Sequence, residues 1–192
     1  MIGIGKKAPL FACDVVIDGQ IKQMCLNDFA GQYKVLFFYP LDFTFVCPTE
    51  LHAFQDRLED FRKRNVAVIG CSVDSAYSHS AWLRTPKKSG GIEGITYPLL
   101  ADINKTISRL YGVLDEEQGV ALRGLFIIDK DDVVQCASVN NLPIGRNVDE
   151  VIRLIDALQF AEKSGQVCPA NWQEGRKAME PTDKGLADYF AE

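Results

Sequence analysis

Hydrophobic and polar residues follow one another along the chain in patterns that predict strands and helices in turn. Residues 35–39 form a continuous apolar run, which is typical of a central strand buried on both faces. Residues 11–25 predict a hairpin, because two strand-like segments flank a turn at Asp18 and Gly19. Further strands are expected at residues 66–73, 120–128 and 133–139.

Helical spacing marks several of the segments between these strands. From residue 48 to residue 64 the apolar positions recur every three or four residues and so share one helix face: Leu51, Phe54, Leu58 and Phe61. Residues 148–162 predict a strongly amphipathic helix by the same pattern. Shorter helices are expected at residues 74–84 and 103–111, with an irregular glycine-containing loop at residues 85–97.

Strands that alternate with helices indicate a mixed α/β fold with helices on the faces of the sheet. A length of 192 residues is enough for one well-buried core and too short for two ordinary domains. The pattern weakens after residue 163. We therefore expect a main domain over residues 1–163 and a C-terminal arm over residues 164–192 that finds its cover elsewhere, for example on another subunit.

Charge and hydropathy limit the partners of the chain. It has 21 basic and 26 acidic residues, a net charge of -5, so a basic surface for nucleic acid or anionic lipid is not expected. Residues 1–13 lack the basic start and long apolar stretch of a secretory signal. No apolar run is long enough to span a membrane, and we expect a soluble, cytoplasmic protein.

Six cysteines are the main chemical feature of the composition. The chain has no Cys-x-x-Cys pair and only two histidines, so neither a structural metal site nor a thioredoxin-type dithiol is expected. Buried cysteines commonly serve as small core residues. We apply that interpretation to the four in apolar or strand-like surroundings: Cys13, Cys25, Cys71 and Cys136.

Cys47 has a setting that favours reactivity. It precedes Pro48 where a helix is predicted to begin, which places it at or beside the N-cap, and Glu50 stands where a capping-box partner would. The N–H groups of a first helical turn stabilise negative charge, and a thiolate carries such a charge. The alternative is an inert cysteine that caps a helix.

Other polar residues add to this candidate centre. Thr44 places a hydroxyl three residues before Cys47, where the alternative role is a loop hydrogen bond. Arg123 precedes an apolar strand segment, and an arginine that enters such a strand needs an anion or solvent. A thiolate and an oxygen-rich substrate would satisfy it, as would a salt bridge at the sheet margin. Arg146, after Gly145, is a second candidate.

These residues resemble the peroxidatic-cysteine signature of the peroxiredoxins, whose core Pro-x-x-x-Thr-x-x-Cys is matched by Pro40, Thr44 and Cys47. Residues 167–172 resemble the resolving-cysteine motif of the typical two-cysteine class, which includes the peroxidase component of the alkyl hydroperoxide reductases. Residues 122–129 resemble the segment that carries the active-site arginine. The resemblance covers essentially the whole chain, and it implies a thioredoxin-like mixed sheet with an N-terminal hairpin and a C-terminal arm.

The resemblance implies a thiol-dependent peroxidase that acts on hydrogen peroxide and organic hydroperoxides without a cofactor or a metal. Cys47 would attack the peroxide and become a sulfenic acid. Cys168, from the other subunit, would then form a disulfide with it. Thioredoxin or a similar dithiol reductant would restore both thiols by exchange. The implied assembly is a homodimer that goes on to a decamer.

The resemblance also implies roles for the residues around Cys47. The Thr44 hydroxyl, Arg123 and nearby backbone N–H groups would hold the peroxide oxygens as charge develops on them. Pro40 would wall the pocket. Glu50 and Arg146 would hold Arg123 in place.

The match departs from overoxidation-prone members in one loop. Such members carry a Gly-Gly-Leu-Gly loop and a C-terminal Tyr-Phe pair. Here Tyr189 and Phe190 are present, although ordinary packing of a terminal helix is an alternative role for them, and the loop at residues 90–94 has Glu93 where the last glycine is expected. We therefore predict intermediate sensitivity to overoxidation.

Two other function classes remain open at this point. A cysteine hydrolase needs a histidine base near the sulfur. His52, five residues after Cys47, points about 140° away on a helix, and His79 belongs to another predicted element. A non-enzymatic holdase chaperone or redox-signalling scaffold built on the same oligomer is the other alternative.

Overall fold

The computed structural model describes residues 3–191. Contacts between residues divide the chain into two compact units, residues 1–146 and residues 147–192. This division falls before the long helix at residues 148–164, whereas the expected domain boundary, between residues 163 and 164, falls at the last residue of that helix. The two units are described in turn.

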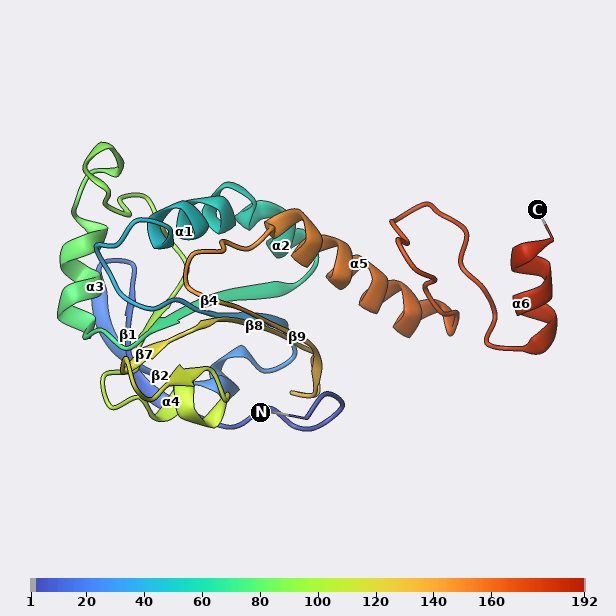
Figure 1. Ribbon diagram of the computed structural model, residues 1–192, viewed down its shortest axis with the longest axis horizontal. Coiled ribbons are helices and arrows are strands. Elements are labelled where there is room, and N and C mark those ends of the chain that lie inside the picture. The colour runs from blue at the N-terminus through green and yellow to red at the C-terminus, as the bar shows by residue number, and fades with distance from the viewer. Residues whose placement is uncertain (1–2, 192) are drawn as a thin grey trace. The chain divides into compact units, whose positions relative to one another are not determined.

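The first unit is built on one seven-stranded mixed sheet (Figure 1). Its strands in spatial order are β2 (Gln20–Cys25), β1 (Ala12–Ile17), β5 (Leu99–Ala101), β4 (Val66–Ser72), β3 (Tyr33–Phe38), β8 (Arg123–Ile128) and β9 (Val134–Asn140). The three central strands, β3, β4 and β5, run parallel, and every pairing outside them is antiparallel. The predicted mixed α/β sheet and its N-terminal hairpin are confirmed.

The central strand β3 is buried along its whole length, as its apolar run predicts. Leu36 and Phe38 belong to the core cluster on one face of the sheet, whereas Phe37 stacks on Phe54 at 4.3 Å between ring centroids. Figure 1 shows helices α1 and α2 along one side of the central strands and α4 on the opposite side. The loop that leaves β3 therefore starts from a fixed point in the core.

The α-helices described in the first unit are α1 (Cys47–Asp56), α2 (Leu58–Lys63), α3 (Ala76–Leu83) and α4 (Thr106–Leu110), and two short 3-10 helices lie at Leu26–Phe29 and Lys87–Ser89. The single helix predicted over residues 48–64 is wrong in one respect, because Arg57 (φ -107°, ψ 8°) interrupts it. Arg57 instead begins a new turn, in which its Nε donates to Asp60 Oδ2 at 2.6 Å. The predicted apolar face is confirmed, since all four of its residues are buried: Leu51, Phe54, Leu58 and Phe61.

The strand predicted over residues 120–128 is also two elements. β7 (Val120–Ala121) pairs with β6 (Leu114–Asp115) in a separate two-stranded sheet, and β8 begins at Arg123. The break occurs because the Leu122 N–H donates to the Val113 carbonyl at 2.8 Å, away from the main sheet. The pattern does not predict β5, whose three residues are too short a run to show a period.

The cysteines interpreted as core residues are only partly so. Cys71 is completely buried in β4, which confirms the interpretation for that residue. The other three are half-buried: Cys13, Cys25 and Cys136.

The second unit contains α5 (Val148–Ser164) and α6 (Asp183–Phe190). The α5 helix begins at an Asn147 N-cap, whose side chain accepts from the Asp149 and Glu150 N–H groups, and it ends at Gly165 with φ 72°. Its buried residues repeat with the predicted amphipathic spacing: Val148, Val151, Ile152 and Ile155. Within residues 3–191, no helix has both the length and the apolar composition to cross a membrane.

Candidate active site

Cys47 is the first residue of α1 and is completely buried. Val46 takes the N-cap position, so Cys47 lies in the first turn of the helix and not at its cap. The predicted capping box is wrong, because no side chain caps this helix and the Glu50 carboxylate instead faces two arginines. The first turn is still where the helix dipole stabilises negative charge.

The loop between β3 and Cys47 is fixed by a buried polar cluster that the sequence reasoning missed. Tyr39 Oη donates to Asp42 Oδ1 at 3.0 Å, and His79 Nδ1 lies 2.8 Å from Asp42 Oδ2. The Asp42 N–H donates to Asp74 Oδ2 at 2.6 Å, and Ser78 Oγ donates to Asp42 Oδ2 at 2.7 Å. Burial raises the pKa of both Tyr39 and Asp74. The cluster ties the loop to α3 and so limits how far Cys47 can move.

Arg123 is the first residue of β8 and reaches Cys47 from the sheet. Its side chain is 4% exposed, and its Nη1 donates to Cys47 Sγ at 3.5 Å. The same Nη1 donates to Glu50 Oε2 at 2.7 Å, and Nε donates to the Leu142 carbonyl at 2.6 Å. The guanidinium is therefore held on three sides. The sequence could not identify Leu142 as a partner of Arg123, because a residue of any type has a backbone carbonyl.

Glu50 joins Arg123 to Arg146. Its Oε1 accepts from Arg146 Nε at 2.8 Å and from the Arg146 backbone N–H at 2.9 Å, and its Oε2 accepts from Arg146 Nη2 at 2.8 Å. Arg146 Nη1 also donates to the carbonyls of Phe38 and Gly124, both at 2.7 Å. Burial lowers the pKa of Arg146, and Glu50 acts against that shift. These hydrogen bonds fix the Arg146–Glu50 pair to Phe38 at the end of β3 and to Gly124 near the start of β8.

The buried group of Arg123, Arg146 and Glu50 carries one more positive charge than negative charge. Two guanidinium groups, on Arg123 and Arg146, surround the one carboxylate of Glu50. A buried excess positive charge is unfavourable unless an anion accompanies it. A thiolate at Cys47 supplies that anion at the position where Arg123 Nη1 already points. The arrangement therefore places a buried guanidinium donor at the sulfur, where it can stabilise negative charge.

A cavity of about 430 Å³ adjoins this group. Arg123 forms part of its wall and also contacts Cys47, which does not itself line the cavity. Pro40 and Thr44, both predicted site residues, line it together with mostly apolar neighbours: Leu41, Phe45, Val46, Gln118, Val120, Leu142 and Pro143. Thr44 Oγ1 donates to the Leu41 carbonyl at 3.0 Å, which is the loop hydrogen bond of the alternative interpretation. The lone pairs of that hydroxyl can still accept from a bound molecule.

Both histidines are bonded elsewhere. His52 Nε2 lies 3.1 Å from the Gly91 carbonyl, and His79 is held between Asp42 and the Leu100 carbonyl. Within residues 3–191, neither has a hydrogen bond to Cys47. A histidine-activated hydrolase centre is therefore not formed at this sulfur.

Cys168 lies in the second unit, in the segment after α5. It is a half-buried free thiol whose Sγ donates to the Ala157 carbonyl at 3.5 Å. Burial raises the pKa of this thiol, and the Arg153 guanidinium acts in the opposite sense. Arg153 also donates to the Trp172 carbonyl at 2.8 Å, and the sequence pattern did not predict this contact. Cys168 is thus a free thiol that lies against α5 through its contact with Ala157.

Family comparisons cover most of the chain. The AhpC/TSA family matches residues 4–137, and the C-terminal domain of 1-Cys peroxiredoxin matches residues 157–192. The chain is 52% identical over 188 residues to a thioredoxin peroxidase of Echinococcus granulosus, with 98% of this chain and 97% of the relative covered. It is 53% identical over 189 residues to a chloroplastic 2-Cys peroxiredoxin, BAS1, of Hordeum vulgare, with 98% and 90% covered.

A solved structure agrees over almost the whole chain. The reduced 2-Cys peroxiredoxin of Plasmodium vivax superimposes with a TM-score of 0.96 at 49% identity, and the match covers 98% of each chain.

Proposed function

The chain belongs to the AhpC/TSA family of peroxiredoxins and is a thiol-dependent peroxidase, and from that premise we propose that Cys47 is its peroxidatic cysteine. The observation that carries the proposal is the contact of Arg123 Nη1 with Cys47 Sγ at 3.5 Å, inside a buried group with one uncompensated positive charge. The Cys47 thiolate attacks one peroxide oxygen. An S–O bond forms as the O–O bond breaks, and the leaving oxygen takes a proton to become water or an alcohol.

The surrounding residues stabilise the charge that moves in this step. Arg123 donates toward the reacting oxygens, and the Thr44 hydroxyl turns from the Leu41 carbonyl to the substrate. Pro40 closes the wall of the cavity. Glu50 and Arg146 are positioning residues, because they contact Arg123 or its support and reach no reacting atom.

Cys168 is the resolving cysteine of this proposal. Its thiolate attacks the sulfenic acid of Cys47 in another subunit, an S–S bond forms, and the hydroxyl group leaves as water. Thioredoxin or a similar dithiol reductant then reduces the disulfide. Support comes from the names of similar proteins, which are a thioredoxin peroxidase and 2-Cys peroxiredoxins.

We further propose a homodimer that assembles to a decamer. β9 is an edge strand of the main sheet, and an exposed edge presents backbone groups that a second copy can pair with. Exposed apolar side chains before and after Cys47 offer a second contact surface: Leu41, Phe43, Phe45 and Tyr77. A reducing compartment such as the cytoplasm suits a chain whose cycle depends on thiols.

Peroxide consumption tests the peroxidatic role. Cys47→Ser is expected to abolish consumption of hydrogen peroxide in the presence of thioredoxin, thioredoxin reductase and NADPH. Cys25→Ser, at a half-buried cysteine of β2, is the matched control and is expected to retain full activity. Equal consumption by wild type and Cys47→Ser would overturn the assignment. The comparisons do not favour a purely non-enzymatic chaperone or scaffold.

A further inference from the structure

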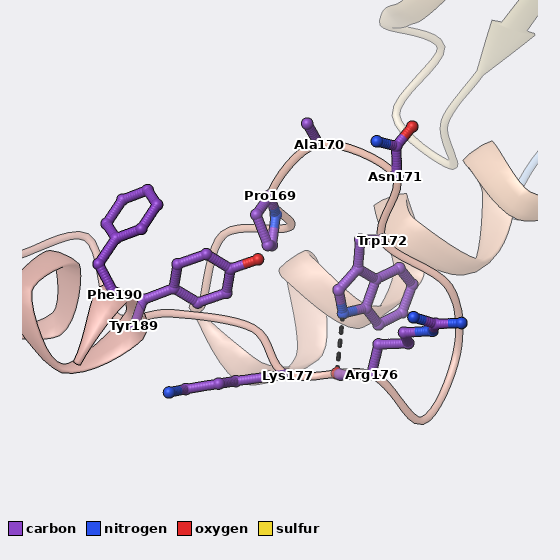
Figure 2. Close-up of a pocket in the computed structure, with 8 residues that line it drawn as sticks. All are labelled: Pro169, Ala170, Asn171, Trp172, Arg176, Lys177, Tyr189 and Phe190. Atoms are coloured by element: carbon purple, nitrogen blue, oxygen red, sulfur yellow. Dashed lines mark hydrogen bonds between the residues drawn. The ribbon is translucent and has the colours of Figure 1, made fainter. Parts of the chain in front are cut away.

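Cys168 lies on a closed loop over residues 167–179, which we call the resolving loop. Two backbone hydrogen bonds, at 2.9 and 3.2 Å, join the first and last residues of this loop. Trp172 fills its interior, because it is 2% exposed and its Nε1 donates to the Arg176 carbonyl at 3.1 Å, the dashed line in Figure 2. Loops whose ends meet and whose own side chains fill them are compact. The loop therefore gives Cys168 a defined setting.

One face of α5 carries the resolving loop. Arg153, Ala157 and Phe160 are spaced by four and three residues, so they lie on the same side of the helix. The Ala157 carbonyl accepts from Cys168 Sγ at 3.5 Å. The Trp172 carbonyl accepts from Arg153 Nη1 at 2.8 Å, and the Trp172 ring packs on Phe160 at 4.9 Å between centroids. Arg153 thus lies one helical turn from the residue that Cys168 contacts.

The Arg153 guanidinium has a fixed orientation. Its Nε and Nη2 donate to the two oxygens of the Glu150 carboxylate at 2.6 and 2.7 Å, which leaves Nη1 directed at the resolving loop. The Arg153 side chain is 26% exposed, so the protein covers most of it. A guanidinium also stays protonated throughout the pH range of thiol chemistry. The loop therefore lies against a permanent positive charge.

This charge acts on the ionisation of Cys168. The thiolate, and not the thiol, is the nucleophile in disulfide formation. Burial raises the pKa of Cys168, and Arg153 acts in the opposite sense because a nearby cation stabilises the thiolate. Glu150 weakens the field of Arg153, since its carboxylate shares the guanidinium. Arg153 therefore offsets part of what burial costs this nucleophile.

We propose that Arg153 is a positioning residue for the resolving step, in which it holds a positive charge beside Cys168 and so raises the ionised fraction of this thiol at neutral pH. The inference rests on the proposed function, in which the Cys168 thiolate attacks the Cys47 sulfenic acid. An S–S bond forms as the S–O bond breaks, and the hydroxide that leaves takes up a proton to become water. The ionisation of Cys168 releases one proton, so the step is balanced without a further oxidant.

Arg153 also anchors the resolving loop, and the two roles predict opposite effects when it is removed. If it were only an anchor, its loss would free Cys168, and this thiol would react faster at every pH with an unchanged midpoint. If it supplies charge, its loss leaves a less ionised thiol. The midpoint of the pH profile then moves to higher pH, and the reaction at neutral pH becomes slower.

The test measures the alkylation of Cys168 by iodoacetamide, a neutral reagent, from pH 6 to pH 10 in the full-length Cys47→Ser protein. Mass spectrometry of the Cys168 peptide gives the rate at each pH. Arg153→Met is expected to move the midpoint to higher pH and to slow alkylation at pH 7 by about three- to tenfold. Lys163→Met removes an exposed cation of the same helix and is the matched control, which is expected to keep the profile of the parent protein.

Two further variants separate charge from hydrogen bonding. Arg153→Lys retains the charge and is expected to recover at least half of the lost rate. Arg153→Gln can still donate to the Trp172 carbonyl but is neutral, and it is expected to behave like Arg153→Met. An unmoved midpoint in Arg153→Met, faster alkylation at pH 7, or recovery by Arg153→Gln would overturn the inference.

A second readout uses the chain with Cys47 intact. After rapid mixing with one equivalent of peroxide, Arg153→Met is expected to form the disulfide more slowly by the same factor, with an unchanged rate of Cys47 oxidation. An unchanged rate of disulfide formation would also overturn the inference. If wild type itself forms no Cys47–Cys168 disulfide, the proposed function fails instead, and the alkylation profile of Cys168 shows this separately.

Discussion

Replacing Arg123 with methionine removes the guanidinium that lies 3.5 Å from the Cys47 sulfur while keeping most of the side-chain volume. Loss of one preorganised donor to a developing oxyanion costs about 10²- to 10³-fold in rate, or about 2.7–4 kcal/mol. The Arg123→Met variant is therefore expected to react with hydrogen peroxide about 100- to 1000-fold more slowly than wild type. Lysine at this position is expected to recover little, because a single ammonium cannot reproduce the forked contacts.

The structure also limits the loss of stability in this variant. Glu50 keeps its hydrogen bonds from Arg146, so no buried carboxylate is left unpaired. The Leu142 carbonyl loses a donor at 2.6 Å, which costs about 1–3 kcal/mol. Domains have about 5–15 kcal/mol to lose, so the variant is expected to remain folded.

The assay is stopped-flow measurement of the second-order rate constant for Cys47 oxidation, with urea unfolding of the same samples. Arg109→Met is the matched control, because it removes an exposed arginine that is paired with Glu116 and is not part of the Cys47 site, and it is expected to leave the rate unchanged. A folded Arg123→Met variant that reacts within threefold of wild type would refute the reasoning. So would an equal loss of rate in Arg109→Met.

Three further predictions follow from the site and its neighbours. Glu50→Gln leaves two buried guanidinium groups without their carboxylate and is expected to lower the free energy of unfolding by about 3–5 kcal/mol in urea, whereas the exposed Glu59→Gln does not. Burial raises the pKa of Cys13 to about 12, so its alkylation at pH 8 is expected to be roughly 10³-fold slower in the folded chain than in the unfolded chain. Because the thiol ionises at a lower pH in the unfolded chain, the free energy of unfolding is also expected to fall as the pH rises above about 9. Labelling of Cys13 at the unfolded rate would contradict this. Glu93→Gly is expected to raise the yield of Cys47 sulfinic acid in a peroxide titration read by mass spectrometry, and full overoxidation of wild type at stoichiometric peroxide would exclude intermediate sensitivity.

Much of the first unit could be predicted because its strands and helices have clear periods. The continuous run in β3 and the three-four spacing in α1 and α2 reflect burial directly. The interruption at Arg57 could not be read from the pattern, because the same apolar face continues on both sides of it. β5 could not be predicted either, since three residues are too few to show an alternation of apolar and polar positions.

The candidate site was predictable where chemistry restricts the residue type. A cysteine before proline at a helix start and an arginine before a buried strand both need an explanation, and the structure brings Cys47 and Arg123 together. Contacts with backbone carbonyls could not be predicted, because they do not depend on residue type. Examples are the hydrogen bonds from Arg123 to Leu142 and from Lys177 to Asp188. The same holds for Asp42 and His79, whose pairing depends on two segments meeting in the fold.

The central claim is that Cys47 and Cys168 of different subunits close one disulfide in each turnover. The most direct measurement mixes Cys47→Ser and Cys168→Ser subunits, lets them exchange, adds one equivalent of peroxide and resolves the products on a non-reducing gel with mass spectrometry of the linked peptides. The account predicts a disulfide-linked dimer in the mixture, joined through the remaining Cys47 and the remaining Cys168, and none in Cys47→Ser alone. A mixture that stays monomeric on the gel while wild type forms the disulfide within one chain would contradict it.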